Sequence, residues 1–151
     1  FIGYEWTSLV NTGDNLHRVV IYRDGPELAL RHAPYTTMAP LGSPDPMDLW
    51  KWMSNYESQS AGDVLAIAHN GNLSNGIMFP LDRQYTGRRL DKLYINERIL
   101  RDPLYEVTQI KGDGEAHPFL SPTDEFADYE TWAKGNLNLS VAKTNDMLQY
   151  E

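Results

Sequence analysis

One short run of residues constrains the fold of this chain more than any other feature. Val64-Leu65-Ala66-Ile67-Ala68 is apolar throughout, ends at His69 and is followed by the polar loop Asn70–Gly76. A short continuous apolar run bounded by turn residues is typical of a strand buried on both faces, as in parallel sheets. In α/β folds the loops after such strands carry the chemistry, so His69 is placed like a ligand or a base. A hydrogen-bonded histidine that closes a strand is the alternative.

The bulk composition limits the kind of partner. The chain has 151 residues, a net charge of −8 at pH 7 and no cysteine. This length suits one domain with a proper core, and the missing thiols exclude disulfides, thiolate nucleophiles and cysteine zinc sites. An acidic surface repels phosphate backbones, and no apolar stretch approaches the ~20 residues of a membrane helix. We therefore expect a small-molecule substrate and neither a nucleic acid nor a membrane.

Several properties stay open at this level. An anionic substrate is compatible with the acidic chain, because bound metal ions reverse the local field. The oligomeric state and the choice between a periplasmic and a cytoplasmic location in a bacterium are undetermined. The chain begins with the strand-like Phe1-Ile2-Gly3-Tyr4-Glu5 and without a starting Met, so we expect it to be cut from something longer.

The clearest helix signal begins at Asp45-Pro46. Asp45 suits the N-cap and proline suits the first helical position. One apolar stripe follows at helical spacing and consists of Leu49, Trp52, Met53 and Tyr56. The helical pattern ends near Ala61-Gly62. Because the strand ending at His69 follows this helix at once, the sequence predicts βα-type winding.

Further elements follow from composition and turn signals. We expect strands over 1–7, 16–22 and 104–110, a helix over 88–100 and a short helix over about 125–133. The segment 34–46 holds four prolines and a glycine and should be irregular, as should the chain from Gly135 onward.

Three residues near the ends of predicted strands are candidate metal ligands: Glu5, His17 and His69. A carboxylate with imidazoles suits Zn, Mn or Fe, and two or three such ions could share bridging ligands. The spacing forms no compact motif such as H-E-x-x-H. A Glu5–arginine pair and an exposed His17 are the alternatives.

Two polar segments supply candidate substrate contacts and proton carriers. Asn70 and Asn72 follow His69 and could orient a substrate, although Asn and Gly also simply make turns. Lys111 is a further candidate for substrate binding. Glu115 and His117 could act as catalytic acid–base partners, and a capped, charged loop is the alternative.

The combined motifs resemble those of the uncharacterised family DUF3604, a relative of the PHP (polymerase and histidinol phosphatase) superfamily. The likeness runs along nearly the whole chain, and the asparagine-rich loop is its most specific part. The motifs are Gly3–Ser8, Asn15-Leu16-His17-Arg18, Ala66–Gly76, Gln109-Ile110-Lys111-Gly112, Glu115-Ala116-His117-Pro118 and Leu120–Phe126.

This resemblance implies a fold and an activity. The fold would be α/β, part of a distorted TIM-like barrel with parallel strands, flanking helices and long irregular loops. The centre would hold two or three divalent ions, with Glu5, His17 and His69 among the ligands, and would hydrolyse phosphoester-type bonds. A non-catalytic PHP-like module that binds a ligand or a partner is the rival, and hydrolysis of sulfate esters or amides is a third option.

The sequence also departs from the superfamily. PHP proteins begin with a strand bearing His-x-His and a following Asp-His and end with Asp-x-His, and none of these motifs occurs here. The resemblance therefore predicts that residues 1–151 form the central portion of a single PHP-like domain, truncated at both ends. We expect this piece to carry only part of the ligand set and to have little turnover alone.

Overall fold

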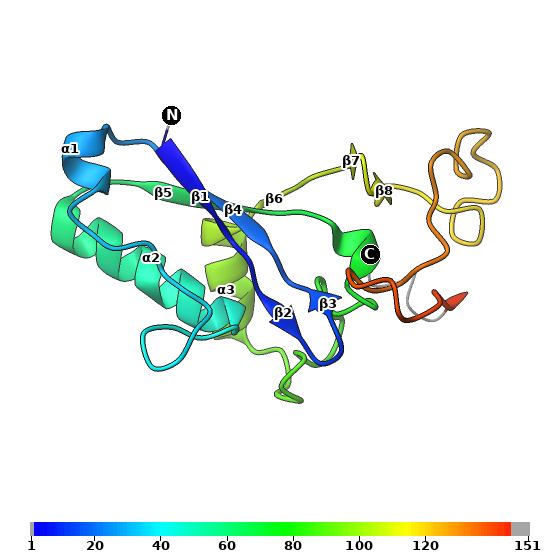
Figure 1. Cartoon of the computed structure of the whole chain (residues 1–151), viewed down its shortest axis with the longest axis horizontal. Helices are drawn as coiled ribbons and strands as arrows, with labels where there is room; N and C mark the ends of the chain where they lie inside the picture. Colours follow the sequence, from blue (N-terminus) through cyan, green and yellow to red (C-terminus); the bar gives the residue numbers. More distant parts are fainter. Residues whose placement is uncertain (1, 146–151) are drawn as a thin grey trace. The chain divides into compact units, whose positions relative to one another are not determined.

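The computed structural model describes residues 2–145, which divide into two compact units (Figure 1). The first unit contains residues 2–8, 17–68 and 91–105. The second contains residues 9–16 and 69–90 together with the described chain from 106 onward. Each unit is described by itself.

The first unit is a four-stranded sheet with helices. Strand order is β1-β4-β5-β6, and β4 pairs antiparallel with both β1 and β5, whereas β5 and β6 are parallel. The strands are β1 (Ile2–Trp6), β4 (Arg18–Tyr22), β5 (Val64–Ala68) and β6 (Leu104–Tyr105). The helices of this unit are α1 (Pro26–Ala29), α2 (Pro46–Ser60) and α3 (Lys92–Arg101).

The predicted fold class is wrong. Residues 2–145 form small open sheets whose pairings are antiparallel except between β5 and β6, and these residues close no TIM-like barrel. The apolar run misled the prediction because Leu65 and Ile67 make β5 look buried on both faces. Only Val64, Ala66 and Ala68 are fully buried, so β5 has one covered face.

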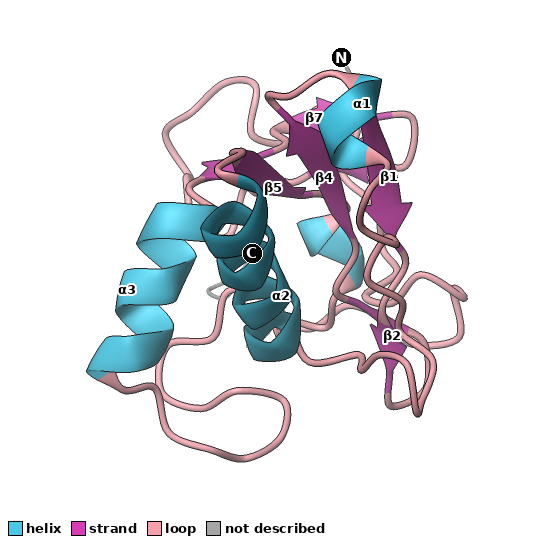
Figure 2. Cartoon of the chain, turned by 90° about the vertical axis from the view of Figure 1, so that its left-hand side faces the viewer, coloured by secondary structure: helices cyan, strands magenta, loops and turns pink. Residues whose placement is uncertain are grey.

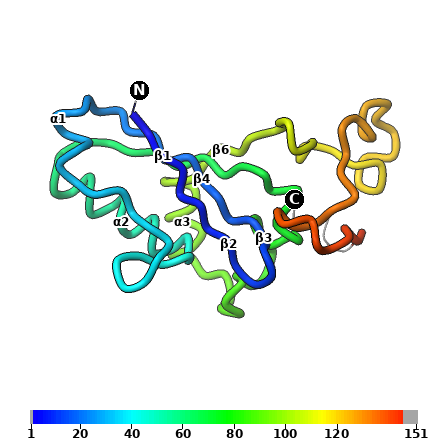
Figure 3. The backbone as a smooth tube through the Cα atoms, viewed as in Figure 1, coloured from blue at the N-terminus to red at the C-terminus, as the bar shows by residue number. Residues whose placement is uncertain are grey.

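The route of the chain after β4 explains the antiparallel pairing. The irregular segment between α1 and α2 carries the chain back along the sheet, as the tube in Figure 3 shows. Ser8, just beyond the end of β1, donates a hydrogen bond to the Pro44 carbonyl oxygen (2.8 Å). Helix α2 therefore starts beside the beginning of β4, and β5 must run opposite to β4.

Helix α2 confirms the predicted signals. Asp45 is the N-cap and its Oδ1 accepts a hydrogen bond from the Met47 amide (2.9 Å), with Pro46 at the first helical position. Ala61 ends the helix in the left-handed conformation (φ 54°) and donates to the Glu57 carbonyl oxygen. Local capping thus fixes both ends of the helix.

The core lies between one face of the sheet and the helices. Alternate residues of β4 and β5 face this core, and α2 and α3 pack against β5 and against each other (Figure 2). Leu49 and Met53 of α2 are completely buried, and each such side chain stabilises the fold by about 1.5–3 kcal/mol. Trp50 meets Tyr94 of α3 edge to face, with ring centroids 5.2 Å apart.

The second unit consists of hairpins and hydrogen-bonded loops. Its elements are β2 (Leu9–Val10) paired with β3 (Asp14–Asn15), β7 (Thr108–Gln109) paired with β8 (Gly112–Asp113), and the 3-10 turn η1 (Gly71–Leu73). An isolated bridge joins Ser74 to Asn136. Asparagine side chains also join distant parts of this unit: Asn136 Nδ2 donates to the Thr12 carbonyl oxygen (3.2 Å) and Asn72 Nδ2 to the Lys111 carbonyl oxygen (3.0 Å).

Two predicted elements differ from the structure. The strand expected over 104–110 is divided between β6 and β7. The helix expected over 125–133 is a series of turns, in which Asp124 Oδ1 accepts from the Phe126 amide (2.9 Å). Phe126 and Tyr129 are 70% and 64% exposed, so a helix here would have little apolar surface to bury.

Among the helices described, none has the length and apolarity required to cross a membrane.

The N-cap of α2 gives a direct test of this local account. Asp45→Ala should lower the free energy of unfolding by about 1 kcal/mol, because the Met47 amide loses its acceptor. Asp45→Asn keeps a side-chain oxygen that can accept this hydrogen bond, so its free energy of unfolding should stay within about 0.3 kcal/mol of the wild type. Urea unfolding of both variants checks the prediction, and equal losses would contradict it.

Candidate metal centre

Strand pairing brings together the ends of β1, β4 and β5. Trp6 pairs with Arg18, and Arg18 pairs with Ala68. If the antiparallel β4–β5 register is extended by one residue beyond the Arg18–Ala68 pair, His17 lies opposite His69. Side chains alternate between the two faces of a sheet, so residues 17 and 69 share the face of Glu5 and not the face covered by α2.

The three predicted ligands form one cluster. His17 Nδ1 lies 3.0 Å from Glu5 Oε1, with the geometry of a hydrogen bond donated by the imidazole. Glu5, His17 and His69 each offer one ligand atom, and these atoms all lie within 4.8 Å of one another. His69 directly follows Ala68, the last residue of β5, so the pairing of β5 fixes the position of its backbone.

The donor set fits a divalent transition metal. Zinc binds imidazole nitrogen and carboxylate oxygen at about 2.0–2.2 Å, so two ligands of a tetrahedral ion lie about 3.4 Å apart. The ligand atoms of the cluster lie within 4.8 Å of one another, so the widest separation would have to shorten around an ion. Three protein ligands leave a position for water, the arrangement of catalytic rather than structural zinc.

Burial is uneven around the cluster. His17 and His69 are each only 8% exposed, whereas the Glu5 side chain is 47% exposed. The imidazoles are therefore held within the protein, and the carboxylate borders solvent. An ion bound here would be reached from the Glu5 side.

The loop after His69 is fixed by a buried asparagine. Asn15 Nδ2 donates to the carbonyl oxygens of His69 (2.7 Å) and Asn70 (2.8 Å). Asn70 adopts the left-handed conformation (φ 55°), which asparagine tolerates better than most residues, and η1 follows. The backbone that carries His69 is thus held from one side by β5 and from the other by Asn15.

The predicted substrate-binding residues have different surroundings. Asn70 is 4% exposed, and its Oδ1 accepts no hydrogen bond from the described residues. Asn72 is 1% exposed and donates through Nδ2 to the Lys111 carbonyl oxygen (3.0 Å), which ties the loop to the β7–β8 turn. Lys111 Nζ donates to Gln109 Oε1 (3.1 Å).

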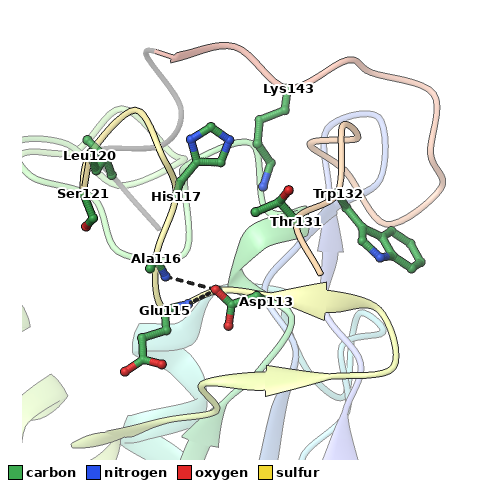
Figure 4. Close-up of a pocket in the computed structure, with 10 residues that line it drawn as sticks. Asp113, Glu115, Ala116, His117, Leu120, Ser121, Thr131, Trp132 and Lys143 are labelled. Atoms are coloured by element: carbon green, nitrogen blue, oxygen red, sulfur yellow. Dashed lines mark hydrogen bonds between the residues drawn. The ribbon is translucent and has the colours of Figure 1, made fainter. Parts of the chain in front are cut away.

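The predicted catalytic residues Glu115 and His117 line a pocket of the second unit (Figure 4). Asp113 and Lys143 also line it, and Asp113 Oδ2 accepts hydrogen bonds from the backbone amides of Glu115 (3.2 Å) and Ala116 (3.0 Å). The exposed Glu115 carboxylate points away from the His117 ring in Figure 4. The two side chains therefore do not form an acid–base pair in this arrangement.

The surroundings of His117 favour its neutral form. Its Nδ1 accepts a hydrogen bond from the Phe119 amide (3.1 Å), which requires that nitrogen to be unprotonated. Partial burial, together with the positive charge of Lys143, lowers the pKa of His117. In this neutral form Nε2–H is a hydrogen-bond donor, whereas proton donation as a general acid needs the protonated ring.

Comparison with protein families supplies one match. The family whose description is "Protein of unknown function (DUF3604)" matches residues 1–151. The chain belongs to DUF3604. No curated protein and no solved structure gives a significant match. The family assignment made from the motifs is therefore confirmed over the full chain.

Sequence reasoning did not single out three residues that organise the site. Asn15 holds the carbonyls of His69 and Asn70, and Arg18 pairs with Asp102 behind the cluster (2.9 Å). Asn15 and Arg18 lie within the motif that contains His17, but Asp102 is 84 residues from Arg18 and carries no local signal of its contact.

The state of His117 can be tested by titration. Its imidazole should titrate below the ordinary value of about 6.5, and Lys143→Gln should raise its pKa by removing the nearby charge. NMR of the histidine ring protons across pH 4–9 (roughly the range that spans histidine titration) measures both values. Lys134→Gln is the matched control and should leave the pKa unchanged. A His117 pKa at or above the ordinary value would contradict this account.

Proposed function

We propose that this DUF3604 chain carries ligands of a metal-dependent hydrolase that acts on phosphoester-type substrates. The observation that carries the proposal is the convergence of Glu5, His17 and His69 from strand ends that are distant in sequence. Carboxylate and imidazole together select Zn, Mn or Fe. In the same proposal, intact proteins of the family assemble two or three such ions.

The metal ions supply one kind of chemistry: they lower the pKa of a bound water towards neutrality and stabilise charge that develops on the substrate. Glu5, His17 and His69 would hold them. The open side at Glu5 would admit the substrate, whereas the buried imidazoles would keep the ligand geometry. The acidic chain would then accept an anionic substrate, because the ions reverse the local field.

The other predicted site residues also have roles within this proposal. Asn70 Oδ1 would accept a hydrogen bond from a bound water or a substrate hydroxyl, because a buried amide oxygen is costly to leave unpaired. Asn72 would contribute indirectly, because its hydrogen bond to the Lys111 carbonyl oxygen fixes the loop after His69. The Lys111 ammonium group would attract the anionic group of the substrate. Neutral His117 would donate a hydrogen bond through Nε2–H, and Glu115 would need a different rotamer to join it.

The motif resemblance to PHP hydrolases adds to the proposal. It concerns the carboxylate and the two histidines and not the barrel, which residues 2–145 do not form. The same activated water could attack sulfate esters or amides. Phosphoesters are preferred here because the resemblance points to them.

The test is removal of one imidazole. His69→Ala should weaken Zn²⁺ or Mn²⁺ binding by more than about 100-fold, because loss of groups that merely orient a ligand already costs about 10- to 100-fold. Elemental analysis and calorimetric titration measure the metal, and turnover of aryl phosphomonoesters and phosphodiesters measures hydrolysis.

The control is His32→Ala, a histidine that packs on Tyr56 outside the cluster. It should keep the metal content of the wild type. Unchanged metal binding in His69→Ala would remove His69 from the ligands. Tight metal binding without hydrolysis of any ester by a full-length member of the family would favour a non-catalytic binding module.

A further inference from the structure

A buried ion pair lies directly beside the candidate ligands. Arg18 Nε donates to Asp102 Oδ2 (2.9 Å), and both side chains are completely buried. The other carboxylate oxygen, Oδ1, accepts from the backbone amide of Ala68 (3.2 Å). One carboxylate therefore joins the first residue of β4 to the last residue of β5.

The two anchored residues are the chain neighbours of the two imidazoles. Arg18 follows His17, and Ala68 precedes His69. Because successive side chains point to opposite faces of a sheet, Arg18 faces the helices while the histidines face away from them. Asp102 can thus fix the spacing of the two strand ends without occupying the space in which an ion would bind.

Stability alone does not account for a buried pair of this kind. Replacing buried ion pairs by apolar side chains of similar volume is often neutral or stabilising. A carboxylate that accepts from two fixed donors gives instead a defined geometry. Asp102 directly follows α3 and precedes β6, so it also ties the end of that helix to the same point.

We propose that Asp102 is a positioning residue for the candidate metal centre and acts through Arg18 and Ala68 on His17 and His69. This inference rests on the proposed function. It adds that the affinity for a divalent cation depends on a carboxylate that is not itself a ligand.

The experiment uses Co²⁺ alone, because its visible absorption reports both affinity and coordination geometry. Asp102→Asn should raise the Co²⁺ dissociation constant at least about tenfold and change the spectrum. Since this variant leaves the buried Arg18 charge beside a neutral amide, Arg18→Met/Asp102→Leu is measured alongside it. The double variant removes both charges and retains the packed volume.

Circular dichroism melting verifies that each variant folds. The matched control is Glu57→Gln, which breaks the partly buried Arg101–Glu57 pair and touches neither strand end. It should lower the melting temperature and keep the Co²⁺ affinity of the wild type.

The outcomes separate the two proposals. Weaker Co²⁺ binding in a folded Asp102 variant, with normal binding in Glu57→Gln, supports the positioning role. Wild-type affinity and spectrum in the folded double variant overturn that role and leave the metal centre standing. Absence of Co²⁺ binding by the wild type overturns the proposed function and this inference with it.

Discussion

The pairing of β4 with both of its neighbours is the constraint on which the candidate centre depends. Its register sets Trp6, Arg18 and Ala68 side by side. His17 immediately precedes Arg18, His69 immediately follows Ala68, and Glu5 precedes Trp6 on β1. A slip of one residue would turn each of these side chains to the other face of the sheet. The cluster is therefore a consequence of backbone hydrogen bonding as much as of ligand choice.

Local signals in the sequence predicted much of the first unit. The Asp45-Pro46 cap and its stripe located α2, and the apolar run located β5 and the position of His69 at its end. These features succeed because caps, turns and side-chain periodicity act over a few residues. The ligand atoms of the three candidate side chains lie within 4.8 Å of one another, and their role as metal ligands stays a prediction.

The non-local features could not be predicted in the same way. Strand direction depends on the irregular segment before α2, which returns the chain to the start of β4, and no local pattern in its prolines encodes that route. The Asp102–Arg18 contact spans 84 residues. Likewise Asn72 looked like a loop residue free for substrate, whereas its amide is used to hold the Lys111 carbonyl. Tertiary hydrogen bonds, which the sequence does not display, decide these roles.

The most direct test of the account is anomalous X-ray diffraction from crystals of the protein grown with Zn²⁺. The account predicts an anomalous peak within about 2.2 Å of a Glu5 oxygen and of one imidazole nitrogen each from His17 and His69. Zinc bound elsewhere, with the Glu5–His17 hydrogen bond intact and no peak beside His69, would contradict it.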